Sequence, residues 1–169
     1  MSGTVQPGGA PGGENNLVVA RYRSGVDDVL DALEDVTEED LDRRSPDPEA
    51  WSAREVVHHL ADSETNSYLR LRRLVADEGR PEIAGYDEAG WASRLRYADR
   101  PVEASLTVFV AVRAASAELI ASMGDDIDWA RVGVHSDSGD YTADDWLRIY
   151  ADHAHEHADQ IRRARNGQA

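Results

Sequence analysis

Apolar side chains recur at intervals of three and four residues along four long segments of the chain, a spacing typical of amphipathic helices. The segments cover about residues 17–33, 52–77, 101–123 and 142–165. Val, Ile and Thr do not alternate regularly with polar residues over a stretch of strand length. The pattern therefore predicts four long helices and almost no β-sheet.

Two of these helices open with the same capping signal. Ser52 is followed three residues later by Glu55, and Thr142 is followed three residues later by Asp145. In a capping box, the first side chain accepts a hydrogen bond from the backbone N–H three residues on, and the acidic side chain accepts one in return. These pairs predict that the second long helix begins after Ser52 and the fourth after Thr142.

Shorter elements fill the connections between the four helices. One turn of helix is predicted at residues 38–43, and a connecting helix at residues 86–97 lies in the crossover between the second and third long helices. Pro101 is predicted to occupy the first position of the third long helix, because no intrahelical bond needs a backbone N–H there. Gly124 is predicted to end that helix, and the turn-forming residues 133–141 predict a loop.

Together these elements predict an all-α protein, a four-helix bundle with a short extra helix in the crossover. The chain has 169 residues, which suits one domain. Residues 1–16 are rich in Gly and Pro and are predicted to form a flexible N-terminal tail. The bundle domain is therefore expected over residues 17–166.

The charge balance narrows the range of partners. The chain has 33 acidic residues against 18 basic ones, all of them Arg, and its net charge is −15. This excess of negative charge disfavours nucleic acid and anionic membrane, so we expect a small-molecule substrate and also consider a homodimer. We expect no apolar run to approach the ~20 residues of a membrane span, and we expect a cytoplasmic location.

The chain contains no Cys, which excludes disulfides, a protein thiol nucleophile and any Cys-ligated metal site. A thiol that takes part in a reaction would have to come from a small molecule. Metal ligands would have to come from other residue types. The six histidines are the first candidates, because five of them fall within only two of the predicted helices.

Two histidines of the last helix lie on its apolar face. That face follows steps of three and four residues along the helix: Trp146, Tyr150, His153, His157, Ile161 and Ala164. His153 and His157 are one turn apart, so both imidazoles can reach one metal ion. His155 lies about 200° around the helix from His153, and we expect it to face solvent.

These histidines also have less specific interpretations. A single inward-facing His is more often a hydrogen-bonded core residue than a ligand, and a HxxxH pair alone is a weak motif. A third ligand would have to come from the second long helix, because two imidazoles rarely hold zinc without help. His58 and His59 are the candidates there. The helical period does not choose between them, although His59 shares a polar face with Ser63 and Asn66.

Several segments resemble the DinB-like superfamily of metal-binding bundles. The start of the family's second helix is similar to PEAWSAREVVHHLADSE, and its Trp-Ser and Leu-Ala-Asp motifs align the family's ligand with His59. The family's last helix is similar to YADHAHEHADQI, where HxxxH supplies two further ligands that fall on His153 and His157. The YfiT-type branch of the family resembles YDEAGWA, at residues 86–92.

The resemblance implies one divalent metal ion, zinc or nickel in the first place, held by His59, His153 and His157. Three imidazoles leave coordination positions for water or a substrate atom, which distinguishes a catalytic site from a closed structural one. YfiT-type proteins have been labelled "putative metal-dependent hydrolases". Other relatives look like S-transferases that use low-molecular-weight thiols such as mycothiol or bacillithiol.

From this resemblance, our first expectation is an S-transferase whose metal activates a small thiol. A hydrolase that activates water is the alternative, and a non-catalytic stress or interaction protein with a structural metal is a further one. An enzyme needs an open coordination position, whereas a structural site needs a fourth protein ligand. The nearest candidates for a fourth ligand are Asp62, Glu64 and Asp152.

Overall fold

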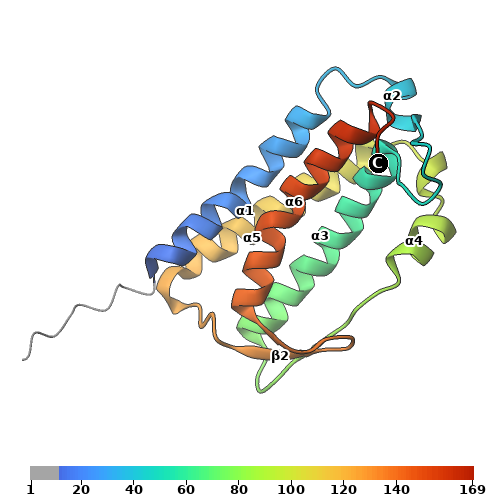
Figure 1. The fold of residues 1–169 in the computed structure, drawn as a ribbon. Coiled ribbons are helices and arrows are strands. Elements are labelled where there is room, and N and C mark those ends of the chain that lie inside the picture. Colours follow the sequence, from blue (N-terminus) through green and yellow to red (C-terminus); the bar gives the residue numbers. More distant parts are fainter. Residues whose placement is uncertain (1–11) are drawn as a thin grey trace, which may run out of the picture.

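The computed structural model describes residues 12–169 and shows a bundle of four long helices (Figure 1). The long helices are α1 (Gly12–Ala32), α3 (Ala53–Ala76), α5 (Glu103–Met123) and α6 (Ala143–Ala164). The short helical elements are α2 (Glu38–Asp42), α4 (Glu88–Arg94) and the 3₁₀ turns η1 (Tyr97–Asp99) and η2 (Gly124–Asp126). The predicted all-α four-helix bundle is confirmed, and α4 is the extra helix in the crossover.

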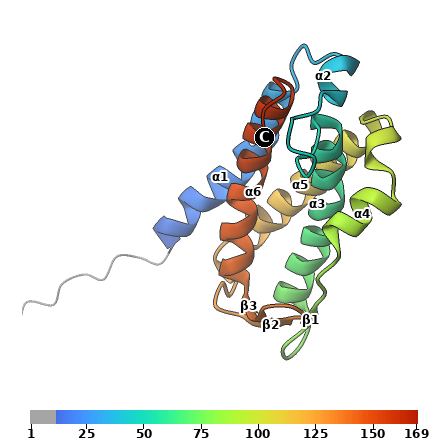
Figure 2. The ribbon, with the colours of Figure 1, turned by 45° about the vertical axis from the view of Figure 1, so that its right-hand side comes forward.

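The order of the helices around the bundle differs from their order along the chain. Helix α6 packs between α1 and α3, and α5 packs against α3 and α1 on the opposite side (Figures 1 and 2). Helices α1 and α6 run in one direction, and α3 and α5 run in the other (Figure 1). The crossover through α4 makes this arrangement possible, because it returns the chain to the end of the bundle where α3 began.

A small sheet closes one end of the bundle (Figure 2). Strand β1 (Glu82–Ile83) pairs in parallel with β2 (Val132–His135), and β2 pairs antiparallel with β3 (Gly139–Thr142). The loop predicted at residues 133–141 is therefore wrong, because β2 and β3 form a hairpin there. The strands of this hairpin are too short to show an alternating pattern in the sequence. Strand β2 also pairs with β1, which is distant in the sequence.

Both predicted capping boxes form. The Ser52 N–H donates to Glu55 Oε2 at 2.8 Å, and the Glu55 N–H donates to Ser52 Oγ at 3.4 Å. The Thr142 N–H donates to Asp145 Oδ2 at 2.8 Å, and the Asp145 N–H donates to Thr142 Oγ1 at 2.9 Å. These caps set the first residues of α3 and α6, the two helices that carry five of the six histidines.

Three predicted boundaries need correction. Helix α1 begins at Gly12, inside the range predicted as a tail, and the rest of that range, residues 1–11, lies outside the described residues. Helix α5 begins after Val102, so Pro101 precedes the helix instead of opening it. The connecting helix expected at residues 86–97 is split into α4 and η1, because Arg96 adopts a left-handed conformation with a φ of 56°.

Helix α5 is unusually apolar. With the following turn, Glu103–Asp126, it is long and apolar enough to cross a membrane by length and composition, with a mean hydropathy of 1.6. This corrects the expectation that no apolar run has that length. Only 22% of its apolar window is buried, but in this fold α5 packs against α1 and α3 as a bundle helix. The cytoplasmic location stays a prediction.

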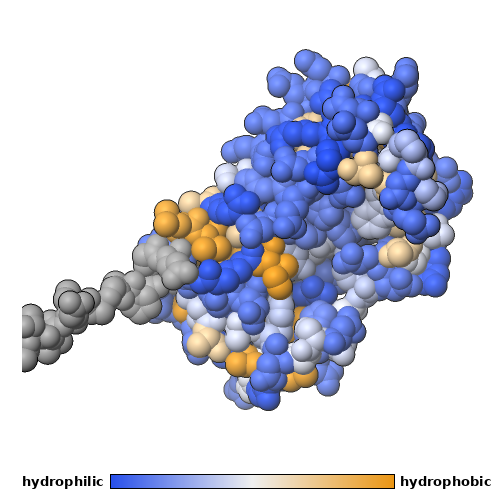
Figure 3. All heavy atoms as spheres, in the orientation of Figure 1, coloured by the Kyte–Doolittle hydropathy of each residue, from blue (hydrophilic) through white to orange (hydrophobic). Residues whose placement is uncertain are grey.

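The surface in Figure 3 is mostly hydrophilic, in agreement with the net charge of −15. Hydrophobic side chains gather near the start of α1, where Leu17 is 76% exposed (Figure 3). Leu60 and Leu71 of α3 and Trp146 and Ile161 of α6 are fully buried. The core therefore lies between the long helices.

A buried ion pair occupies the centre of the bundle. Arg113 of α5 contacts Glu64 of α3, and both side chains are 1% exposed. Arg113 also donates to the Tyr22 carbonyl of α1 at 3.0 Å and to the Tyr150 carbonyl of α6 at 2.7 Å. One guanidinium therefore joins all four long helices.

Gly25 allows α1 to approach this centre closely. A Cβ atom at Gly25 would lie 2.7 Å from the Ala154 Cβ and 2.9 Å from Arg113 Nη2. Neither neighbour can move freely, because the Ala154 Cβ is fixed to the α6 backbone and Arg113 is held by its contacts with the three other long helices. The glycine is therefore required by packing, although glycine weakens a helix interior by about 1 kcal/mol relative to alanine.

We predict that Gly25→Ala lowers the melting temperature by several degrees. Helix propensity alone would predict a higher melting temperature, because alanine favours a helix more than glycine does. The measurement is thermal unfolding followed by circular dichroism. Asp27→Ala, an exposed position on the same helix, is the control and should change the melting temperature little. A Gly25→Ala protein more stable than the wild type would show that α1 can move away without cost.

Candidate metal centre

Three histidines from two helices meet on the facing sides of α3 and α6. His59 comes from α3, and His153 and His157 come from α6. Each offers one ring nitrogen, and the three nitrogens lie within 4.8 Å of one another. The Nε2 atoms of His59 and His153 are 3.4 Å apart. The structure thus brings together the three residues that the sequence proposed as ligands.

The spacing of these nitrogens suits a metal ion better than a hydrogen bond. A separation of 3.4 Å is long for a hydrogen bond between ring nitrogens. Two nitrogens bound to one tetrahedral ion, each at about 2.0–2.1 Å, are separated by about 3.3–3.4 Å. The His59 and His153 rings therefore fit shared ligation of one ion.

Neighbouring groups hold the imidazoles in place. His157 Nδ1 lies 2.7 Å from Gln160 Oε1, so an Nδ1–H can donate there and leave Nε2 free to bind a metal. The Trp51 ring packs on the His59 ring with centroids 5.0 Å apart. Ser63 Oγ lies 3.4 Å from His153 Nε2. Sequence reasoning did not assign Gln160, although its position one turn after His157 is a usable signal.

The surroundings keep the three imidazoles uncharged at neutral pH. Burial, followed by the proximity of His157, lowers the pKa of His59 to about 3. Burial also lowers the pKa of His153, with further contributions from His157 and His59, and burial lowers the pKa of His157. A neutral imidazole is the form that binds a metal, so the same burial that disfavours protonation favours ligation.

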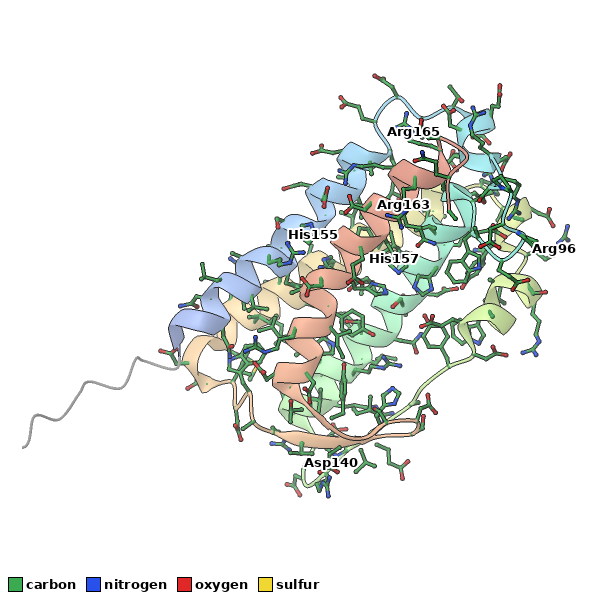
Figure 4. The ribbon with its side chains drawn as sticks, viewed as in Figure 1. Arg96, Asp140, His155, His157, Arg163 and Arg165 are labelled. Atoms are coloured by element: carbon green, nitrogen blue, oxygen red, sulfur yellow. The ribbon has the colours of Figure 1, made fainter. Side chains whose placement is uncertain are left out.

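The other two histidines of these helices have structural partners. His58 is buried, with Nδ1 2.7 Å from Ser105 Oγ and Nε2 3.2 Å from the Arg100 carbonyl oxygen. His155 and His157 lie on different sides of α6, toward α1 and α3 respectively (Figure 4). The expectation that His155 faces solvent is wrong: its Nδ1 is 2.6 Å from Asp28 Oδ2, because α1 packs along that side of α6.

The three candidates for a fourth protein ligand are engaged elsewhere. Asp62 accepts a hydrogen bond from the Tyr97 hydroxyl, and Glu64 pairs with Arg113. Asp152 pairs with Arg21 on the surface, where its side chain is 55% exposed. Among the described residues, the group that could hold an ion consists of the three histidines alone. This arrangement corresponds to an open site and not to a closed structural one.

A polar wall extends from the three histidines along α6 and α3. The Tyr150 ring lies next to the His153 ring, with centroids 5.6 Å apart, and its hydroxyl accepts a hydrogen bond from Arg70 at 2.9 Å. Tyr150 appears in the apolar stripe of the sequence, but its link to Arg70 could not be foreseen. Arg70 is one of 18 arginines, and its sequence neighbours carry no motif.

The fold and the three histidines together define a helical bundle with a candidate metal centre between its second and last long helices. Comparison with known proteins gives the family. The model of the DinB superfamily matches residues 21–161, and the chain belongs to this superfamily.

Several similar proteins are named as metal-dependent hydrolases. A protein of Oceanobacillus iheyensis named "Putative metal-dependent hydrolase" is 31% identical over 150 residues, covering 86% of this chain and 85% of that protein. "Putative metal-dependent hydrolase YfiT" of Bacillus subtilis is 31% identical over 131 residues, covering 77% of this chain and 72% of that protein. The solved structure of YfiT from Bacillus subtilis, titled "a probable metal-dependent hydrolase with an unusual four-helix bundle topology", has a TM-score of 0.81 at 27% identity. The match covers 99% of this chain and 96% of the YfiT chain.

We predict that Ala at His59, His153 or His157 abolishes stoichiometric binding of zinc or nickel. Each substitution removes one of three imidazoles that converge on one point. His58→Ala and His155→Ala are the matched controls and should retain the metal, because their ring nitrogens bond to other groups. The measurement is elemental analysis of the five purified variants. Full retention of metal in His59→Ala would refute the assignment.

We also predict that the metal-free protein stays helical at neutral pH but loses stability as the pH falls below about 6.5. An unfolded chain protonates its histidines there, whereas the folded chain keeps the three buried imidazoles neutral because their pKa values are lowered. Acid therefore favours the unfolded state, by up to about 1.4 kcal/mol per pH unit for each neutral histidine.

Urea unfolding of the metal-free protein between pH 7.5 and 5 measures this dependence. His59→Leu, which removes one of the three buried imidazoles, should flatten the slope. Stability that does not change over this range would show that the folded chain accepts protons on these imidazoles.

Proposed function

We propose that this chain is a metal-dependent hydrolase in which His59, His153 and His157 hold one divalent ion, zinc or nickel. The observation that carries the proposal is the convergence of three neutral imidazoles without a fourth protein ligand in the described group. Imidazole nitrogen suits both of these ions. The names of the relatives, as metal-dependent hydrolases, support the same class of reaction.

The residues around such a site would have different roles. A divalent ion would supply Lewis acidity, lowering the pKa of a group on its free position and polarising a substrate oxygen. Gln160 orients His157 by accepting its Nδ1–H. Ser63 and Tyr150, which lie beside His153, offer hydroxyl donors on the same side. Such donors stabilise the negative charge that develops when a carbonyl group is attacked.

A thiol-dependent S-transferase is the second candidate, and one observation favours it. The nearby carboxylates of Asp62 and Glu64 are both engaged, so neither is free to take a proton from water. A thiol, with an unperturbed pKa of about 8.5, ionises more readily than water and has less need of such a base. Because the chain has no Cys, this thiol would be a small molecule such as mycothiol or bacillithiol.

One set of assays tests both reactions. Zinc-loaded and nickel-loaded protein is incubated with a panel of 4-nitrophenyl esters and anilides, and separately with a haloarene and a panel of thiols that includes mycothiol and bacillithiol. The hydrolase proposal predicts ester or amide cleavage that chelation abolishes and that His153→Ala lowers by at least about 100-fold. His155→Ala, which leaves the three ligands intact, is the control.

The pattern of products separates the candidates. Metal-dependent conjugation of a thiol without hydrolysis would replace the first proposal by the second. Absence of both reactions over the panels would overturn the enzymatic proposal and favour a metal-binding protein without catalytic activity.

A further inference from the structure

Beside the three histidines, a group of polar side chains surrounds one arginine. Arg70 of α3 donates to the Tyr150 hydroxyl at 2.9 Å through Nη1 and to the Ala84 carbonyl at 2.8 Å through Nη2. Tyr150 and Tyr141 are 3% and 6% exposed, whereas Arg70 and Tyr86 are only half-buried. A ligand can therefore reach the arginine from one side.

The arginine is a cation without an anion. Among the described side chains, Arg70 forms no ion pair with a carboxylate, and its two hydrogen bonds go to neutral oxygens. By contrast, the buried Arg113 is neutralised by Glu64. A half-buried guanidinium with only neutral partners is an unusual arrangement, because buried charges are normally paired.

Three buried groups of this cluster have no hydrogen-bond partner. They are Arg70 Nε and the hydroxyls of Tyr86 and Tyr141, and each of these atoms is fully shielded from solvent. A buried donor without a partner costs about 1–3 kcal/mol, so such groups usually mark the place of a bound water or ligand. Three of them around one unpaired cation point to an anionic ligand.

The surrounding charges agree with this interpretation. Burial raises the pKa of Tyr86 and Tyr141, and the positive charge of Arg70 opposes the rise at both. Their hydroxyls thus stay protonated at neutral pH, lie close to Arg70, and can donate hydrogen bonds. Three carboxylates lie near the cluster, but Glu88 is exposed, Asp145 is held in the α6 capping box, and Glu64 pairs with Arg113.

The cluster also adjoins the candidate metal centre. Tyr150 contacts Arg70 through its hydroxyl and the His153 ring through its own ring. Ser63 of α3 lies between the two groups, with its Oγ 3.4 Å from His153 Nε2. A molecule with an anionic end on Arg70 would therefore place its neighbouring atoms beside the three histidines.

We propose that Arg70, with the hydroxyls of Tyr86, Tyr141 and Tyr150, forms a subsite that binds a carboxylate of the substrate next to the three histidines. One guanidinium with neutral donors matches a singly charged carboxylate better than a doubly charged phosphate. The substrate class is then an electrophile, such as an ester or amide, that carries a carboxylate a few bonds from the reacting carbonyl. This proposal deepens the proposed function and rests on it for the location of the reacting atoms.

The subsite can be tested without turnover. Metal-free full-length protein is titrated with glutarate, and binding is followed through the Arg70 Nε–Hε resonance, which Arg70→Lys identifies by its loss. Arg70→Met should weaken glutarate binding by about tenfold or more, measured by calorimetry. Arg73→Met, an exposed arginine one turn away that also bonds to a carbonyl, is the matched control and should bind glutarate like the wild type.

Specificity gives the second measurement. The metal-loaded enzyme should hydrolyse mono-4-nitrophenyl glutarate with a lower KM than 4-nitrophenyl butyrate. Arg70→Met should remove this difference, whereas Arg73→Met should retain it. Arg70→Lys, which keeps the charge but loses the planar fork, should restore part of the preference.

The outcomes separate this proposal from the proposed function. Glutarate binding that depends on Arg70, in a protein that cleaves no ester, would support the subsite and remove the hydrolase. Glutarate binding that is equal in the wild type and Arg70→Met would overturn the subsite, even if esters are cleaved. Tight binding of inorganic phosphate in place of glutarate would likewise overturn it.

Discussion

The geometry of the whole bundle depends on the buried contact between Arg113 and Glu64. Removing two charges from water is costly, and it is tolerated here because the guanidinium also satisfies the carbonyl groups of Tyr22 and Tyr150. All four long helices therefore meet at one side chain. Leaving either charge without its partner would cost about 3–5 kcal/mol. The pair thus acts as a strict positional constraint, whatever its net contribution to stability.

Tyr150 transmits this constraint to the candidate site. Its carbonyl accepts from Arg113, its hydroxyl accepts from Arg70, and its ring lies against His153. Because His153 is three residues further along α6, fixing the Tyr150 backbone also fixes where the first imidazole of the last helix lies. The close approach of α1 at Gly25, next to Ala154 and Arg113, adds a second support to α6. The bundle core and the candidate metal centre are therefore parts of one packed unit.

Periodicity and capping predicted what depends on local sequence. The Ser52 and Thr142 caps and the inward positions of His153 and His157 followed from spacing, because a helix fixes its own faces. The choice of His59 over His58 needed the family resemblance, since both lie near the edge of the apolar stripe and both are buried. His155 was misplaced because a helix packed on two sides has no solvent face at that angle. The β2–β3 hairpin and the role of Arg70 depend on tertiary contacts that no local pattern encodes.

The central claim is that three imidazoles hold one ion and leave part of its coordination free. X-ray absorption spectroscopy of the zinc-loaded protein tests it most directly, before and after addition of a small thiol. The account predicts three imidazole nitrogens and one or two light-atom ligands at first. After the thiol is added, one light-atom ligand should be replaced by sulfur at about 2.3 Å. A first shell that contains a fourth protein ligand and does not change with the thiol would contradict it.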